Sequence, residues 1–174
     1  MTTIVYRDGV LAADTRAYSG NPTPIGSKQK IHMLADGSIA GVSTTKPGIS
    51  EAFIAWLNDG GDLGDTERLG SDLDLQALVV KQDGSVFYYH DSVVPSGPLY
   101  GQYFAIGSGD QYALGALSCG ATADGAVAAA SQHDPWTGGE IMKISLRPEA
   151  TEDAIELEPA PEPKKRKSRK KQLA

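Results

Sequence analysis

Cysteine, aromatic residues and long apolar runs are all scarce in this chain of 174 residues. The single cysteine, Cys119, excludes a disulfide within the chain, and neither it nor the three histidines show metal-ligand spacing. No apolar run approaches the roughly 18–20 residues that a membrane helix needs, and the N-terminus lacks the regions of a secretory signal. We therefore expect no metal, no cofactor and no membrane contact. The expected location is the cytoplasm, or the virion interior if the source is viral.

Positive charge is sparse in most of the chain and concentrated at its end. Residues 1–163 hold all 22 acidic residues but only 9 of the 16 Lys and Arg, a net charge of −13. A Pro/Glu-rich spacer begins near residue 151, and positions 164–171 then hold seven basic residues. We therefore expect a domain at 1–150 and a spacer with a disordered basic tail at 151–174. That tail could dock an acidic partner, attract nucleic acid by counterion release, or act as a localisation signal, and the sequence does not decide.

Three Asp-Gly pairs, each flanked by strand-forming residues, predict three β-hairpins. An Asp-Gly pair readily takes the positive φ values of a tight turn. The predicted strand pairs are Thr2–Tyr6 with Val10–Asp14, Gln29–Leu34 with Ser38–Ser43, and Leu75–Val80 with Ser85–Tyr89. Glu140–Leu146 alternates in the same way and predicts a further strand. Hairpins at this spacing imply antiparallel sheets.

Helical patterns lie between and after the hairpins. The predicted helices are Gly48–Leu57, Asp110–Cys119, and one that starts at a Thr122 or Asp124 cap and ends near Gln132. On the first of these, Ile49, Phe53, Ile54 and Leu57 share one face. Residues 60–74 and 91–102 are predicted to be loops. Antiparallel sheets together with helices define an α+β fold.

Four stretches carry the candidate chemistry. They are Thr2-Thr3-Ile4-Val5 with Gly9–Ala17, Ser27-Lys28-Gln29-Lys30-Ile31, Ile106-Gly107-Ser108-Gly109 with Tyr112-Ala113, and Asp134-Pro135-Trp136-Thr137-Gly138-Gly139. In this order and register they resemble the proteasome β-subunit and the related bacterial two-component threonine peptidase, in a shortened form. Both belong to the N-terminal-nucleophile hydrolase superfamily. Each motif is weak alone, but four in register across most of residues 2–147 are specific.

The resemblance implies a four-layer αββα sandwich and a threonine peptidase that assembles as a homo-oligomer. It makes Thr2 the nucleophile once Met1 is removed. The implied catalytic set is Thr2, Asp14, Lys30, Ser108, Asp134 and Thr137, with an oxyanion donor at the backbone N–H near Thr44. The implied substrate pocket is walled by Ala17, Lys28, Val42 and Lys46. The separation from the aspartate in the family selects Lys30, not Lys28, as the catalytic lysine.

Chemistry explains why these residue types must meet. A threonine hydroxyl is a poor nucleophile and needs an adjacent base, and a first-residue threonine has its own α-amine for that purpose. The ordinary pKa of an α-amine is about 7.7–8.0, so roughly a tenth to a sixth of it is neutral at pH 7. A nearby Lys30 ammonium disfavours a second positive charge and raises that neutral fraction. Asp14 would hold Lys30 in place.

Two departures from the family leave an alternative function open. Thr44-Thr45 stand where the family has two glycines, and Asn58–Asp74 contains too many Gly and Asp residues for the family's second long helix. The alternative is a catalytically silent structural or interaction subunit, with the basic tail as its docking or nucleic-acid-binding element. Separately, each motif has a purely structural interpretation: Asp14 and Lys30 could be an ordinary surface ion pair, and Gly107-Ser108-Gly109 a common loop that enters a helix.

Substrate preference depends on which way the two lysines of the pocket point. If Lys28 and Lys46 both point inward, the pocket is cationic and favours acidic residues before the cut. Lysine side chains also extend into solvent, and the sequence leaves that choice open.

Overall fold

The computed structural model describes residues 2–21, 23–70 and 72–146, whose strands form three antiparallel sheets. A four-stranded sheet has the order β10-β1-β2-β11, a five-stranded sheet the order β5-β6-β7-β8-β9, and β3 pairs with β4. The strands are β1 Thr3–Arg7, β2 Val10–Asp14, β3 Arg16–Tyr18, β4 Pro24–Ser27, β5 Ile31–Met33, β6 Ile39–Thr44, β7 Leu75–Val80, β8 Val86–His90, β9 Ser96–Leu99, β10 Tyr103–Gly107 and β11 Ile141–Ser145.

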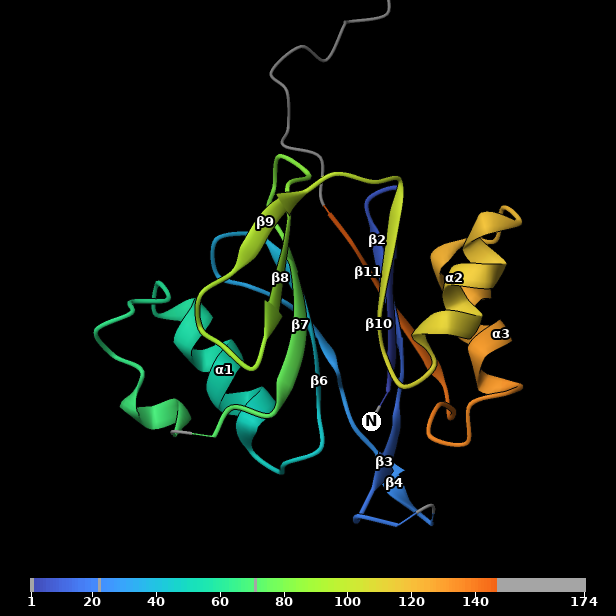
Figure 1. The fold of residues 1–174 in the computed structure, drawn as a ribbon, viewed down its shortest axis with the longest axis horizontal. Coiled ribbons are helices and arrows are strands. Elements are labelled where there is room, and N and C mark those ends of the chain that lie inside the picture. Colours follow the sequence, from blue (N-terminus) through green and yellow to red (C-terminus); the bar gives the residue numbers. More distant parts are fainter. Residues whose placement is uncertain (1, 22, 71, 147–174) are drawn as a thin grey trace, which may run out of the picture.

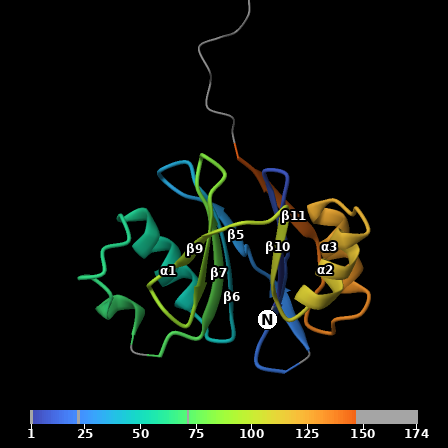
Figure 2. The ribbon, with the colours of Figure 1, turned by 45° about the horizontal axis from the view of Figure 1, so that its top comes forward.

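Helices cover the outer faces of the two larger sheets (Figure 1). Helix α1 (Ile49–Asn58) packs on the five-stranded sheet, whereas α2 (Asp110–Ser118) and α3 (Ala123–Ser131) pack together on the four-stranded sheet. Figure 2 shows the same layer order from another side: α1, the sheet that contains β6 and β7, the sheet that contains β10 and β11, then α2 and α3. The fold is therefore a four-layer αββα sandwich, as the resemblance implies.

Alternate residues along the strands fill three separate cores. On β1, Ile4 and Tyr6 face the other sheet, while Val5 faces α2 and α3. On β7, Leu78 faces the four-stranded sheet and Val79 faces α1. This is the period of two expected for a strand. Because both faces of the central strands are covered, both sets of alternate residues are apolar.

The three predicted hairpins are present, each as a pair of antiparallel strands. β1 pairs with β2, β5 with β6, and β7 with β8. In the first turn Asp8 and Gly9 both have positive φ, at 50° and 76°. Asparagine, aspartate and glycine are the residues that tolerate that conformation. The Asp-Gly pairs therefore mark hairpin turns, as predicted.

The three predicted helices are also present, with bounds shifted by one residue or so. Thr122, rather than Asp124, caps α3, because its hydroxyl accepts the Gly125 N–H at 3.2 Å. The buried face of α1 differs from the prediction. It is centred on Phe53 and Trp56, both at most 2% exposed, and Ile54 lies at its half-buried flank. The predicted face does not include Trp56, whose indole N–H donates to Asp62 O at 2.9 Å.

Four strands were missed by the sequence patterns. β3, β4, β9 and β10 have no clean alternation of buried and exposed residues. β4 is exposed at all four positions, and β9 contains Gly97-Pro98, residues that sequence reasoning assigns to turns. The predicted loop at 91–102 is therefore wrong for Ser96–Leu99, which pairs with β8.

Between α1 and β7 the described residues form one short 3-10 turn, Glu67–Leu69, and no second α-helix, as the composition predicted. None of the described helices is long and apolar enough to cross a membrane. The predicted spacer and basic tail at 151–174 lie outside the described residues, so the domain division stays a prediction.

Candidate active site

Asp14 and Lys30 form a buried ion pair between the two large sheets. Asp14 is the last residue of β2 and 1% exposed, and Lys30 directly precedes β5 and is 6% exposed. Lys30 Nζ lies 3.0 Å from Asp14 Oδ1 and 2.9 Å from Oδ2. The backbone N–H groups of Thr3 and Gly138 each donate to the same carboxylate at 3.0 Å. The pair is therefore an interior feature with its acceptors satisfied, and the surface-pair alternative is wrong.

Burial changes the proton affinity of Lys30. Loss of hydration lowers the pKa of its ammonium below the ordinary 10.5, and the Asp14 carboxylate opposes that change. The neighbouring charges of Lys28 and Arg16 add to the lowering. Lys30 thus releases its proton more readily than a surface lysine, although its carboxylate partner still favours the charged form.

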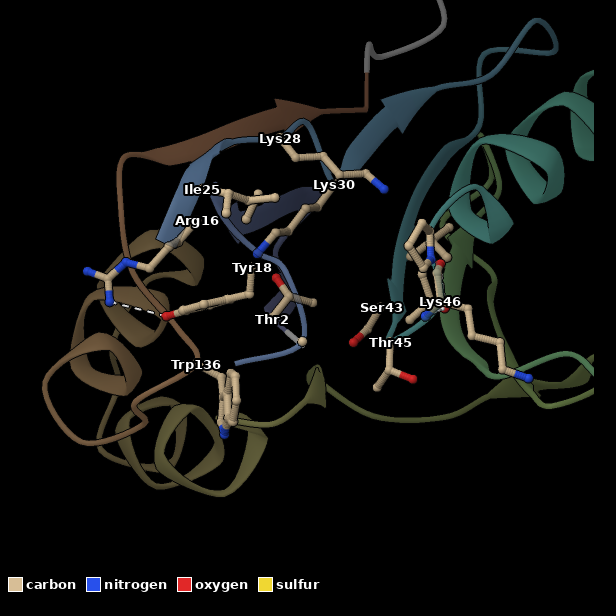
Figure 3. A pocket seen from close by; sticks show the side chains of 15 residues that line it. Thr2, Arg16, Tyr18, Ile25, Lys28, Lys30, Ser43, Thr45, Lys46 and Trp136 are labelled. Atoms are coloured by element: carbon tan, nitrogen blue, oxygen red, sulfur yellow. Dashed lines mark hydrogen bonds between the residues drawn. The ribbon is translucent and has the colours of Figure 1, made fainter. Parts of the chain in front are cut away.

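Thr2 lies beside this pair, directly before β1. Its hydroxyl donates to Asp14 Oδ1, and the residue is 1% exposed. Figure 3 shows the Lys30 ammonium directed toward Thr2. The Thr2 carbonyl accepts the Ser108 N–H at 2.8 Å, which fixes the start of β1 against the loop after β10.

A chain of hydrogen bonds joins the remaining predicted catalytic residues. Ser108 Oγ donates to Asp134 Oδ2 at 2.7 Å, and Thr137 Oγ1 donates to the same oxygen at 2.5 Å. The hydroxyls of Thr137 and Thr3 lie 2.6 Å apart. Asp134 and Thr137 are 5% and 1% exposed. All six predicted catalytic residues are therefore brought together: they come from the residue before β1, the end of β2, the residue before β5, and the loops that follow β10 and α3.

Gly107 explains why the Ser108 loop needs a glycine. Its φ is 97°, and a Cβ added there would overlap the Thr2 carbonyl and approach the Ser43 hydroxyl. Its N–H donates to Gln76 Oε1 at 3.1 Å, a link from β10 to β7 in the other sheet. The loop is thus shaped by its contact with Thr2, which a common loop does not require.

A cavity of about 360 Å³ opens beside Thr2. The predicted substrate-pocket residues Ala17, Lys28, Val42 and Lys46 all line it, as do Lys30 and Thr44. Sequence reasoning missed the other wall residues: Arg16, Tyr18, Gly20, Ile25, Ser43, Thr45, Pro47 and Trp136. Tyr18 stands edge-on to Trp136 with ring centroids 5.2 Å apart, and the Tyr18 hydroxyl donates to Pro135 O at 2.7 Å. No spacing in the sequence signals that pair.

The two pocket lysines are engaged away from the cavity. Lys28 Nζ lies 2.8 Å from Glu51 Oε1 on α1, and Lys46 pairs with Asp72. In Figure 3 both ammonium groups point away from Thr2. Each of these two ammonium charges is therefore offset by a carboxylate, and the alternative in which the lysines extend outward holds. Arg16 also lines the cavity, where its guanidinium donates to the Tyr18 hydroxyl at 3.3 Å.

Thr44 takes a specific role in its loop. Its hydroxyl accepts the Lys46 N–H at 3.0 Å, which is a local side-chain turn. The Thr44 side chain is thus folded toward its own chain, so a Cβ is accommodated where the family has glycine. The role of its backbone N–H as an oxyanion donor stays a prediction.

A four-layer αββα sandwich with a buried threonine at the start of an inner strand is the N-terminal-nucleophile hydrolase fold. Within the described part of the chain, no group of His, Cys, Asp or Glu residues is placed to hold a metal ion. The candidate site therefore consists of three hydroxyls, a lysine and two carboxylates.

Comparisons with known proteins agree with this fold. No protein-family model and no curated protein matches the sequence. Among solved structures, Thiobacillus denitrificans BPH is 19% identical, with a TM-score of 0.56 over 84% of this chain and 98% of that chain. BPH in complex with epoxomicin is also 19% identical, with a TM-score of 0.57 over 84% and 99%. Eukaryotic HslV from Trypanosoma brucei is 14% identical, with a TM-score of 0.60 over 83% and 98%. The chain thus has the fold of these proteasome-related structures, and the resemblance to the proteasome β-subunit is confirmed at the level of fold.

Proposed function

We propose that the chain is a threonine-type N-terminal-nucleophile hydrolase that cleaves peptide bonds. The observation that carries the proposal is the buried Asp14–Lys30 pair, which contacts the Thr2 hydroxyl at the wall of a cavity. A buried ion pair contributes little net stability, because desolvation offsets its attraction. A structural role alone therefore gives a weak reason for placing it beside an N-terminal threonine.

Catalysis requires removal of Met1. While Met1 is attached, the Thr2 nitrogen is an amide and cannot accept a proton. After removal it is a primary amine, which takes the proton of the Thr2 hydroxyl as the oxygen attacks the substrate carbonyl. The resulting oxyanion needs an N–H donor, for which we propose Thr44.

The tetrahedral intermediate then breaks down to an ester, and the ester is hydrolysed in a second step. The amine passes its proton to the leaving nitrogen, the peptide C–N bond breaks, and an ester to Thr2 remains. Water, activated by the same amine, attacks that ester, releases the acyl product and restores the hydroxyl. Lys30 keeps the amine in its neutral form by charge repulsion.

The pocket supports a preference for uncharged residues before the cut. Tyr18, Val42 and Trp136 supply apolar wall, while Lys28 and Lys46 are engaged with carboxylates. We therefore replace the acidic preference considered from sequence with a preference for apolar side chains. A peptide panel varied only at that position tests this.

Intact mass after incubation with a threonine-reactive epoxyketone or β-lactone tests the central claim. Epoxomicin, bound in the Thiobacillus denitrificans structure, is the first choice. We expect one adduct on chain that lacks Met1, and none on Thr2→Ala. Sequencing should find Thr2 as the first residue of active material. If active material retains Met1, the mechanism is wrong.

The silent-subunit alternative makes the opposite prediction, with no adduct and no turnover in a folded chain. The Thr44-Thr45 substitution motivates it, and the local turn made by the Thr44 hydroxyl weakens it. Homo-oligomeric assembly, a cytoplasmic location and an acidic or nucleic-acid partner for residues 164–171 are further proposals. Size measurement, localisation and salt-dependent binding would test them in turn.

A further inference from the structure

A second cavity lies next to the candidate site. It has a volume of about 270 Å³ and shares Ser43, Thr44 and Thr45 with the first cavity. Its other lining residues are Asp74, Leu75, Gln76, His90, Asp91, Gly107 and Ser108. The end of β6 therefore forms a common wall, with Thr2 on one side and the second cavity on the other.

The position of Ser108 sets the order of the two cavities along a bound peptide. Ser108 lines the second cavity, and its N–H donates to the carbonyl of Thr2, the proposed nucleophile. A peptide with its acyl side in the first cavity brings its reacting carbonyl to Thr2. Its leaving side must then continue past Ser43 and Ser108, into the second cavity.

The second cavity is acidic. Asp74 and Asp91 are its two carboxylates, and no lysine or arginine occurs among the described residues that line it. His90, whose Nε2 lies 3.6 Å from Asp91 Oδ2, is the one other titratable lining residue there. Asp91 is held in place, because its Oδ1 accepts the Leu75 N–H at 3.0 Å and its N–H donates to Leu75 O at 2.9 Å. Asp74 is held as well, because its Oδ2 accepts a hydrogen bond from the Thr45 hydroxyl.

Ser43 gives an independent indication of a ligand. The residue is 9% exposed, and within the described part of the chain its hydroxyl has no hydrogen-bond partner. Ser43 lines both cavities, and in Figure 3 its hydroxyl projects toward the space beside Thr2. Among the described residues no fully buried side-chain polar atom lacks a partner, so this hydroxyl is accessible from the cavities and a bound molecule can bond it.

We infer that the second cavity is a subsite for the leaving side of the substrate and takes a basic side chain, with Ser43 bonding the peptide backbone between the two cavities. This inference rests on the proposed hydrolase activity. Asp74 and Asp91 attract the cation, and the aliphatic stem of a lysine or arginine contacts Leu75.

Quenched peptides identical before the cut, with Arg, Gln or Glu directly after it, test the inference. We expect kcat/KM to be about five- to tenfold higher for Arg than for Gln, because both carboxylates are partly hydrated. The double variant Asp74→Asn/Asp91→Asn should reduce that ratio to below about twofold. Asparagine keeps the Oδ1 acceptor for Leu75, so the fold should persist. Asp8→Asn/Asp83→Asn removes two carboxylates at hairpin turns and should retain the preference.

A short substrate with a small fluorophore as leaving group separates the test of the subsite from the test of the hydrolase activity. Wild type and both double variants should cleave it equally, since it places no side chain in the second cavity. Cleavage of the short substrate with equal turnover of Arg, Gln and Glu peptides would overturn the subsite and leave the hydrolase standing. Failure of every substrate, together with no epoxyketone adduct, would overturn both.

Discussion

Asp14→Asn removes the charge from the carboxylate that holds Lys30 between the sheets. The wild-type carboxylate accepts bonds from the Thr2 hydroxyl, the Lys30 ammonium and two backbone N–H groups. Asparagine has nearly the same shape, so no cavity is created. The substitution leaves the 6% exposed lysine without its counter-charge. Removing one partner of a buried pair typically costs about 3–5 kcal/mol, a large part of a total stability of about 5–15 kcal/mol.

Urea denaturation followed by tryptophan fluorescence measures that loss, because Trp56 is 2% exposed in the folded state. At pH 7 we expect the free energy of unfolding to fall by about 3 kcal/mol. Asp36→Asn is the matched control. Asp36 pairs with Lys81 at 3.2 Å on the surface, with side chains 54% and 44% exposed. Its loss should therefore cost less than about 1 kcal/mol.

The pH dependence of the free energy of unfolding tests whether the unpaired Lys30 causes the loss of stability in Asp14→Asn. Burial lowers the pKa of folded Lys30 below 10.5, so between that lowered pKa and 10.5 the unfolded chain binds more protons. The free energy of unfolding therefore rises with pH in this window. Without Asp14, which raises the Lys30 pKa, the window extends to lower pH. The deficit of Asp14→Asn should shrink as pH rises from 7 toward 10. A deficit no larger than that of Asp36→Asn, or one unchanged by pH, would refute the reasoning.

Three further outcomes are expected. Gly107→Ala should abolish activity and destabilise the chain, because its Cβ would overlap the Thr2 carbonyl. Gly115, in α2, has open space around it, so Gly115→Ala should raise the free energy of unfolding by about 0.5–1 kcal/mol, measured by thermal unfolding. Trp56→Ala should reduce the free energy of unfolding by about 3–5 kcal/mol in urea, while Ile54→Ala at the half-buried flank should cost clearly less. Truncation after Glu158 should leave melting temperature and turnover unchanged and reduce salt-sensitive partner binding; a large drop in melting temperature would show that the tail packs on the domain.

Local sequence signals were sufficient to predict the hairpins and the helices. Asp-Gly turns with apolar flanks, and the Thr122 cap before an alanine-rich run, act over a few residues and need no tertiary information. Strands such as β4 and β9 depend instead on partners supplied by the rest of the chain. Nothing in Pro24–Ser27 or Ser96–Leu99 favours a strand without β3 or β8 beside it. Whether these segments form strands therefore depends on tertiary pairing, which the local sequence does not encode.

The sequence predicted which residues form the candidate site, but it did not predict all of their contacts. The motif register named Thr2 and the five residues that meet around it, whereas composition alone would have left Asp14 and Lys30 on the surface. The engagement of Lys28 by Glu51, and of Lys46 by Asp72, could not be predicted, because each pair joins positions more than twenty residues apart. Thr3, which bonds Thr137, was missed since a strand threonine carries no signal of its own.

The seam between the two large sheets has a consequence for when activity can appear. Thr2 directly precedes β1 and Asp14 ends β2 of one sheet, while Lys30 directly precedes β5 and the Thr44 turn ends β6 of the other. A partly folded chain with one sheet formed has a threonine but lacks the lysine beside it, or has the lysine without the threonine. Chemistry then begins only when the halves close on each other. Hydrolysis should therefore be lost in the same cooperative step as the interlayer core, with no weakly active intermediate.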